Sequence, residues 1–377
     1  MQKVVTIFLG AGFSKIGGFP LVSEVNQNFV EFLDTKNVYR YTSSEWSFKA
    51  GEPGFFNEVV QGILKIYKEK TKESFDYESS LSWILKNRSL WSEDSYFEKY
   101  EKRKADLNEV FTNIKFVFVH LIKSVIDRAV KEAMVMKYQF FIEYLIERFL
   151  LQGRTINIFS LNHDILVEKI LNYYGYEFAD GFSITNSPLY HQSKQIQIYN
   201  FAYDKNINLY KLHGSFNYYN IELRIPNSNF SPSYVQGTNY YLKAKISQYL
   251  DKHRAHIKNV KLNPVSNQFN LDIEPNFITG LNKKQLIQQD YVYNDLLRRF
   301  NISYIMSDLV VVMGYSYRDE HVNNIMDLYG MNSKMDLINM NPGMEYALDT
   351  SNKNLNVVNI KNPNEFGYQL QQLDERD

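Results

Sequence analysis

The chain has 377 residues, with 42 basic and 42 acidic side chains, and 44% of its residues are hydrophobic. This composition allows a sizeable buried core, whereas the balanced charge gives no basic field that would favour direct binding of nucleic acid. The absence of cysteine excludes disulfides, thiolate catalysis and cysteine-based zinc sites. Since no run approaches the roughly 20 apolar residues of a membrane helix and the start lacks the pattern of a signal peptide, we expect a cytoplasmic protein that contacts no membrane.

The chain begins with a pattern typical of a nucleotide-binding corner. Residues 4–9 form a short, β-branched-rich run, which predicts a buried parallel strand. Gly10-Ala11-Gly12 follows at once, and helical spacing resumes over residues 23–34, with Ser23 as the expected N-cap. A strand, a glycine turn and a helix in this order favour phosphate binding, although a glycine pair after a strand also occurs in ordinary tight turns.

The spacing of this corner narrows the class of nucleotide-binding loop. Gly10 and Gly12 would let the backbone approach a pyrophosphate, and Ser14 could donate its hydroxyl at the start of the helix. The dehydrogenase fingerprint places a third glycine where this chain has Lys15. No Gly-Lys-Ser/Thr sequence follows either, so a Walker P-loop is also excluded.

Two insertions are expected to interrupt an alternating β/α pattern. Residues 39–151 show helical spacing and little strand alternation, which predicts a large helical insertion. Residues 223–274 are rich in Asn, Ser, Pro and Tyr, which predicts a smaller insertion with one helix near residues 240–256. The remaining segments, 1–38, 152–222 and 275–377, are predicted to form a discontinuous α/β domain, a Rossmann-like parallel sheet with helices on both faces. Its later strands are expected at 155–160, 207–212, 309–313, 335–340 and 355–360, and helices of the large insertion at 59–67, 78–86, 107–123 and 129–151.

Four of the predicted strands end in small residues or in polar residues of catalytic type. The carboxyl ends of parallel strands meet at one edge of a sheet, where ligands bind. Four such endings at one edge therefore predict a functional site. The four sequences are Gly10-Ala11-Gly12, Asn162-His163-Asp164, His213-Gly214 and Gly314-Tyr315-Ser316.

Three of these polar residues suggest chemistry, and each also has a simpler structural interpretation. His213 could take a proton from a sugar hydroxyl near neutral pH, or it could be a hydrogen-bonded histidine of the core. Asn162 and Asp164 could hold a carboxamide, a water molecule or a ribose hydroxyl. Alternatively they cap the loop, with Asp164 as the N-cap of the helix that follows.

A metal site is not expected from the sequence. Asp319, Glu320 and His321 are adjacent, but metal ligands must converge in space, which consecutive residues rarely do. Asp319 is more simply explained as the N-cap of the helix predicted at residues 321–329.

The motifs together resemble the sirtuin family, in its prokaryotic, zinc-free branch of NAD-hydrolysing defence proteins. Their order, spacing and strand context agree with that branch, although neither insertion matches anything specific. The matching sequences are Gly10-Ala11-Gly12-Phe13-Ser14 with Gly18-Phe19-Pro20, Asn162-His163-Asp164, Lys211-Leu212-His213-Gly214, the run Gly314-Tyr315-Ser316-Tyr317-Arg318-Asp319-Glu320-His321, and Ile338-Asn339.

The resemblance implies a site that binds NAD as a substrate and cleaves it without reducing it. It implies that Asn162 positions the attacking water or ribose, that Asp164 helps hold the nicotinamide end, and that His213 is the general base on a ribose hydroxyl. It also implies a set of residues that bind the phosphates and riboses of NAD, namely Gly10, Ala11, Gly12, Ser14, Pro20, Gly314, Ser316 and Asn339.

The departures from the sirtuin deacetylases argue against deacylation of acetyl-lysine. Four zinc-binding cysteines of those enzymes are missing, so no zinc is expected, and Leu21-Val22 replaces their Phe-Arg. The expected function is therefore an NAD glycohydrolase used in antiphage defence, which releases nicotinamide and ADP-ribose. Protein deacylation, ADP-ribosyl transfer and a non-catalytic NAD-binding module remain the alternatives. The resemblance also suggests control by assembly, through homo-oligomers and a partner ATPase of the HerA translocase type.

Overall fold

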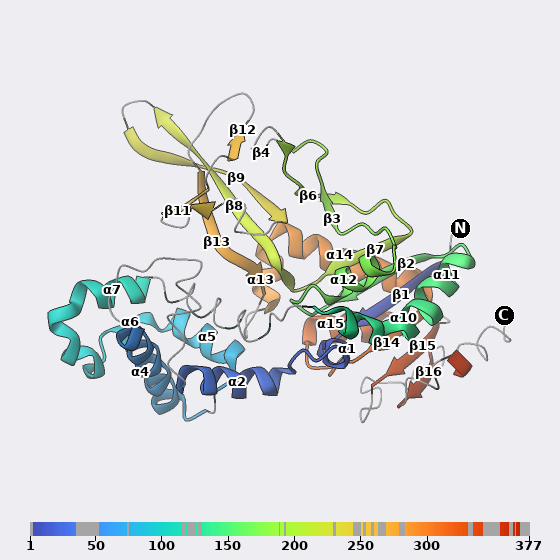
Figure 1. The fold of residues 1–377 in the computed structure, drawn as a ribbon, viewed down its shortest axis with the longest axis horizontal. Helices are drawn as coiled ribbons and strands as arrows, with labels where there is room; N and C mark the ends of the chain where they lie inside the picture. Colours follow the sequence, from blue (N-terminus) through green and yellow to red (C-terminus); the bar gives the residue numbers. More distant parts are fainter. Residues whose placement is uncertain are drawn as a thin grey trace.

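The computed structural model (Figure 1) joins a parallel sheet, a group of helices and an antiparallel sheet. Both chain ends lie on the same side of the view as the parallel sheet, and the antiparallel strands lie above that sheet. It describes residues 3–34, 53–73, 75–112, 114, 118, 122, 126, 130–187, 189–191, 194–228, 231–243, 250–251, 254–257, 260–262, 269–278, 283–330, 335–341, 355–361, 365 and 367–369.

Six parallel strands in the order β16-β15-β14-β1-β2-β7 form the central sheet. Their apolar runs are buried on both faces, as parallel strands covered by helices require. The predicted Rossmann-like parallel sheet is therefore confirmed. The strands are β1 Val4–Leu9, β2 Thr155–Ser160, β7 Ile207–Lys211, β14 Ser307–Met313, β15 Met335–Met340 and β16 Leu355–Ile360.

Helices cover both faces of this sheet, as predicted. Ile7 and Leu9 of β1 belong to one core and Phe8 to the other, because successive strand residues point to opposite faces. The first face is covered by α1 Ala11–Ile16, by α12 Leu166–Tyr173 and by the helical segment 132–151. The second face is covered by α13 Lys283–Gln289, α14 Tyr291–Met306 and α15 Glu320–Gly330.

The segment 132–151 departs from the expected division of the chain. It consists of short helical pieces in sequence, and Tyr138, Phe141 and Leu145 are buried against the parallel sheet. These apolar residues recur at helical spacing, and the sheet face they cover would otherwise be exposed. The end expected for the insertion at residue 151 therefore lies inside the core of the sheet. The pieces are α9 Glu132–Val135, η2 Met136–Tyr138, α10 Gln139–Phe141, η3 Ile142–Glu147 and α11 Arg148–Leu151.

The helices between residues 22 and 112 share a separate hydrophobic core around Trp91. Phe216 packs in this core and Phe277 packs against it, so it contacts the antiparallel sheet. The helices are α2 Val22–Asp34, α4 Pro53–Thr71, α5 Tyr77–Lys86, α6 Arg88–Ser92, the 3-10 helix η1 Ser95–Arg103 and α7 Lys104–Thr112. Residues 39–52 of the expected insertion, and most of the predicted helix 107–123 beyond Thr112, lie outside the described residues.

Two local predictions are wrong. Ser23 is not an N-cap, because α2 already begins at Val22. The described part of residues 240–256 also contains no helix, since residues 240–243 end β9 Ser231–Lys243 and residues 254–257 form β11 Arg254–Ile257; residues 244–249 and 252–253 lie outside the described ranges. Strand β9 pairs with β8 over most of its length, and these tertiary hydrogen bonds override the local helical pattern.

The antiparallel strands extend from the end of β7. The largest of the antiparallel sheets has the order β13-β8-β9-β6-β3, and shorter strands form two further small sheets. The strands are β3 Gly181–Ser183, β4 Leu189–His191, β5 Lys194–Gln195, β6 Ile198–Ala202, β8 Gly214–Ser228, β9 Ser231–Lys243, β10 Leu250–Asp251, β11 Arg254–Ile257, β12 Val260–Leu262 and β13 Phe269–Phe277.

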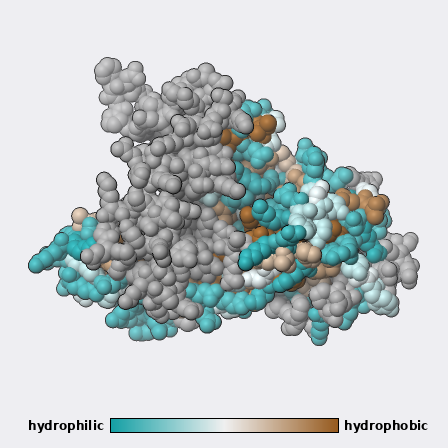
Figure 2. Space-filling view, viewed as in Figure 1, coloured by the Kyte–Doolittle hydropathy of each residue, from teal (hydrophilic) through white to brown (hydrophobic). Residues whose placement is uncertain are grey.

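The surface of the described part is mainly hydrophilic in the view of Figure 2, with hydrophobic residues in separate small groups. Among the helices that the structure describes, none combines the length and the apolar character that a membrane crossing requires.

Candidate functional site

The register of the sheet brings the four predicted strand ends to one edge. Leu9 pairs with Met313 on one side and with Ser160 on the other, and Ser160 pairs with Lys211. The residues that follow these positions therefore emerge side by side at the carboxyl edge of the sheet. We call Gly10-Ala11-Gly12 the glycine corner. The edge predicted from the sequence is thus the place where the glycine corner, Asn162 and His213 lie near one another.

The glycine corner is packed directly against the turn after β14. The backbone nitrogen of Gly10 donates to the carbonyl of Met313 at 2.9 Å, and that of Gly12 donates to the carbonyl of Gly314 at 2.9 Å. A Cβ at Gly12 would lie 2.7 Å from the Gly314 Cα. Gly314 has φ +64°, and a Cβ there would lie 2.1 Å from the Phe13 nitrogen. The glycines at all three positions are therefore required by a backbone contact within the protein.

Tyr138 holds the short helix α1 in place from the adjacent segment. Its hydroxyl donates to the carbonyl of Phe13 and accepts from the nitrogen of Gly17, both at 2.7 Å. Its ring also packs against that of Phe13, with centroids 4.8 Å apart. The segment 132–151 thus supports the corner as well as the sheet.

Ser14, Asn162 and Asp164 form a buried hydrogen-bond network beside this corner. The Ser14 hydroxyl donates to Oδ2 of Asp164 at 2.8 Å, and the Asn162 amide donates to Ser14 Oγ and to the carbonyl of Gly10, both at 2.8 Å. Oδ1 of Asp164 accepts from the backbone nitrogen of Leu166 at 3.0 Å. The N-cap of α12 is Ile165, so the prediction of Asp164 as the N-cap is wrong by one residue. Asp164 still holds the first backbone nitrogen of α12 with one oxygen and orients Ser14 with the other.

This network limits what the two predicted polar residues could do. The amide nitrogen of Asn162 is used within the protein, so its carbonyl oxygen is the atom that could orient a water molecule or a ribose hydroxyl. Both oxygens of Asp164 accept hydrogen bonds from the protein. A role of Asp164 at the nicotinamide end remains a prediction, and it would act most simply by holding Ser14.

Lys211 fixes the adjacent strand end from within the core. Its side chain is completely buried, donates to the carbonyl of Asp164 and lies 4.0 Å from Oε2 of Glu168. Burial raises the pKa of Glu168, while Lys211 opposes that rise. The ammonium group thereby ties β7 to the loop that carries Asn162 and Asp164.

His213 lies at the end of β7 and is 3% exposed. Burial lowers its pKa well below the usual value, and the positive charge of Lys283 and the neighbouring His321 and His163 act in the same direction. His213 is therefore neutral at pH 7 and has a lone pair that can accept a proton. This is the protonation state that the predicted general base needs.

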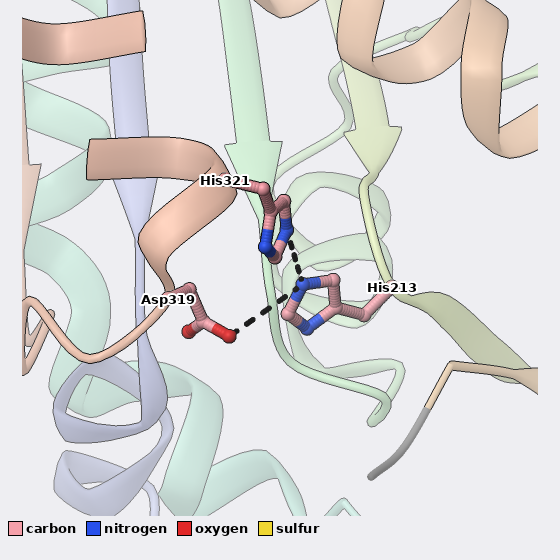
Figure 3. A group of neighbouring side chains, drawn as sticks. All are labelled: His213, Asp319 and His321. Atoms are coloured by element: carbon pink, nitrogen blue, oxygen red, sulfur yellow. Dashed lines mark hydrogen bonds and ion pairs between the residues drawn. The ribbon is translucent and has the colours of Figure 1, made fainter. Parts of the chain in front are cut away.

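Asp319, which directly precedes α15, and His321, in the first turn of that helix, face His213, as Figure 3 shows. The Nε2 atoms of His213 and His321 are 3.1 Å apart, and Asp319 Oδ1 lies 3.9 Å from Nε2 of His213. We call these three residues the His-Asp cluster. Burial lowers the pKa of His321, and Asp319 opposes that shift. Glu320, which stands between them in the sequence, is exposed.

Lys283 of α13 connects this cluster to the helical part of the molecule. Its ammonium donates to Asp319 Oδ1 at 2.9 Å and lies 3.1 Å from Oε2 of Glu78 in α5. Burial alone would lower the pKa of Lys283, but Glu78 and Asp319 outweigh it and raise the pKa. The lysine is therefore charged at pH 7.

His163, which has no function predicted from the sequence, is buried next to the site. Its ring lies 4.7 Å from that of Phe277 and 6.3 Å from that of His213. Burial lowers its pKa to about 3, with smaller contributions from Lys283 and Lys211. Its Nδ1 atom has no hydrogen-bond partner among the described residues.

The remaining predicted ligand residues are placed less favourably or remain untested. Ser316 is exposed and Pro20 half-buried in the loop before α2. Asn339 is buried in β15, where it accepts from Tyr317 at 2.8 Å and donates to Asn359 at 2.7 Å. Its side chain therefore serves a network within the protein, and contact with the adenosine ribose remains a prediction.

His321 and Lys283 are the two site residues that the sequence did not single out as functional. His321 follows Asp319 by two positions directly after a strand end, and this spacing was the available signal. Lys283 gave none, because it belongs to no motif and follows no predicted strand; only the packing of α13 brings it to Asp319.

Comparison with known proteins identifies no family. No family model matches the chain, and no curated protein matches it. Among solved structures, the chain is similar to one from a study of sirtuin substrate affinity, with 11% identity over 99% of this chain and 94% of that one and a TM-score of 0.36. It is also similar to Sir2Tm bound to a propionylated peptide, with 12% identity over 100% and 93% of the two chains and a TM-score of 0.33. These scores are too low to support an argument about function.

Proposed function

We propose that this protein is a sirtuin-like NAD hydrolase that converts NAD and water to nicotinamide, ADP-ribose and a proton. The single observation that supports this most is the meeting of the glycine corner, Asn162 and a neutral, buried His213 at one sheet edge. The glycine corner, Asn162 and His213 all belong to the motifs by which the sequence resembles the zinc-free sirtuin branch.

The proposed reaction assigns one task to each group. The bond between nicotinamide and C1′ of its ribose breaks, and the bonding electrons leave with nicotinamide. The carbonyl oxygen of Asn162 would orient a water molecule toward C1′. His213 would accept the proton of a ribose hydroxyl or of that water and later release it to solvent, which balances the reaction. The phosphates would lie at the start of α1 beside the glycine corner, while Ser14 keeps Asn162 and Asp164 in place.

We further propose that the activity serves antiphage defence by depleting cellular NAD, and that it is held inactive until assembly. Control through homo-oligomers and a partner ATPase of the HerA translocase type follows from the resemblance of the motifs. A co-purification of this chain with such an ATPase, followed by NAD measurement in infected cells, would test both statements.

The direct test is nicotinamide release from NAD by the purified protein, alone and with its partner. Asn162→Ala and His213→Ala should abolish release while the protein stays folded by circular dichroism and thermal unfolding. Asn172→Ala is the matched control, because Asn172 is an exposed residue of α12 away from the site. Unchanged turnover in both site variants would refute the assignment.

Two further outcomes of the same assay would change the function. Nicotinamide release that depends on an acylated lysine peptide, or transfer of label from NAD to protein, would favour deacylation or ADP-ribosyl transfer. Tight binding of NAD without any nicotinamide release would instead indicate a non-catalytic binding module.

A further inference from the structure

The His-Asp cluster combines two imidazoles and a carboxylate in a way that one ion could satisfy. One ligand atom from each of His213, Asp319 and His321 lies within 4.8 Å of the other two. His213 follows the end of β7, whereas Asp319 and His321 lie at the start of α15, so the fold itself makes the group (Figure 3). Two histidines and one carboxylate are also a ligand set of known zinc sites.

The two rings share a hydrogen bond in the ion-free protein, and their separation is also compatible with coordination of one ion by both histidines. Zinc binds histidine nitrogen at about 2.0–2.1 Å, so two nitrogens of a tetrahedral site lie roughly 3.3 Å apart. The observed separation of Nε2 atoms is 3.1 Å. Asp319 Oδ1, at 3.9 Å from Nε2 of His213, is too distant for a hydrogen bond. An ion between the three groups would have to draw the carboxylate inward, since the ligand atoms lie within 4.8 Å of one another and not within the roughly 3.3 Å of a tetrahedral site.

We propose that His213, Asp319 and His321 form a binding site for a divalent transition-metal ion of the zinc class. Both histidines would coordinate through Nε2. In the ion-free state one Nε2 carries the proton shared between the two rings, so binding requires that this proton move to Nδ1 of the same ring or leave to solvent. A water molecule would complete a tetrahedron.

Lys283 is the group that opposes the ion. Its positively charged ammonium already donates a hydrogen bond to Asp319 Oδ1 at 2.9 Å. An incoming cation must compete with it for the carboxylate and is repelled by its charge. Removing this charge should therefore strengthen metal binding, which is the opposite of what removal of a ligand does.

The ion would also regulate the site. A metal on Nε2 of His213 occupies the lone pair that accepts the proton, so zinc should inhibit nicotinamide release. This consequence rests on the proposed function, whereas the metal site itself does not.

The test is a titration of the full chain, free of any histidine tag, with Co²⁺, whose visible absorption reports tetrahedral coordination. We expect one ion per chain and intense absorption. His321→Ala and the nearly isosteric Asp319→Asn should each weaken binding at least about tenfold. Lys283→Met should tighten binding several-fold. Glu320→Ala is the matched control, because this adjacent carboxylate is exposed and lies outside the cluster.

Absence of an absorption change in folded protein at saturating Co²⁺ would overturn the proposal. Equal Co²⁺ binding by the parent protein and His321→Ala would overturn it as well. Because the readout needs no NAD, Co²⁺ binding in a protein that never releases nicotinamide would support the metal site and contradict the proposed function.

Discussion

Replacing Gly314 by alanine should destabilise the protein through the backbone contact that closes the site. Gly314 has φ +64°, which costs an alanine about 1–2 kcal/mol. The new Cβ would also lie 2.1 Å from the Phe13 nitrogen, where only backbone could move away. Overpacking of this kind typically costs about 1–3 kcal/mol. We therefore expect a total loss of about 2–5 kcal/mol in the free energy of unfolding.

Two further glycines separate the contributions of dihedral angle and crowding. Gly153 has φ +69° and nothing within 4 Å of the position that a Cβ would take, so Gly153→Ala should cost the dihedral contribution alone. Gly12 has no positive φ, but its Cβ would lie 2.7 Å from the Gly314 Cα, so Gly12→Ala should show crowding alone. Gly12→Ala also keeps the comparison informative if Gly314→Ala fails to fold.

The assay is urea unfolding followed by circular dichroism, with NAD binding measured on each folded variant. Equal losses of stability for Gly314→Ala and Gly153→Ala would refute the reasoning, because the contact with Phe13 would then cost nothing. A Gly12→Ala variant of unchanged stability that no longer binds NAD would show that this glycine serves the ligand instead of the internal contact.

Two more predictions concern buried charge. Lys211→Met should cost about 3–5 kcal/mol at pH 7 because it leaves Glu168 buried without its cation, and adding Glu168→Gln should restore most of that loss in urea unfolding; additive losses would contradict the pairing. His163 has a folded-state pKa of about 3, whereas an unfolded histidine has a pKa of about 6.5. Between these two values unfolding takes up a proton, so the free energy of unfolding must decrease as the pH falls from about 6.5 toward 3. Between about pH 7 and 5 this histidine should account for about 2 kcal/mol of the loss. His163→Gln should show a correspondingly shallower pH dependence, and an identical slope would disprove it.

The central sheet and its binding edge could be predicted from the sequence because their signals are local. Apolar runs such as 309–313 specify buried parallel strands, and glycine or polar residues after them mark the strand ends. Register then follows from the need to bury both faces. The antiparallel strands could not be predicted in this way, since β9 depends on pairing with β8, which lies outside any local window.

The site divides in the same manner. The sequence alone determined that Asn162, Asp164 and His213 end neighbouring strands, because strand ends are a local property. Only the tertiary structure decided how each is used: Asp164 accepts from the Leu166 nitrogen at the start of α12 and holds Ser14, and the glycines of the corner serve a contact with Gly314.

The His-Asp cluster shows most clearly what chain order hides. Asp319 and His321 are neighbours in the sequence, yet they become partners of His213 only because β14 and β7 end at the same edge of one sheet. Glu320 between them begins α15 and is exposed, because successive residues of a helix point to different sides of its axis. The packing of strands that are distant in the sequence brings these three side chains together. The spacing of residues within the sequence does not predict this arrangement.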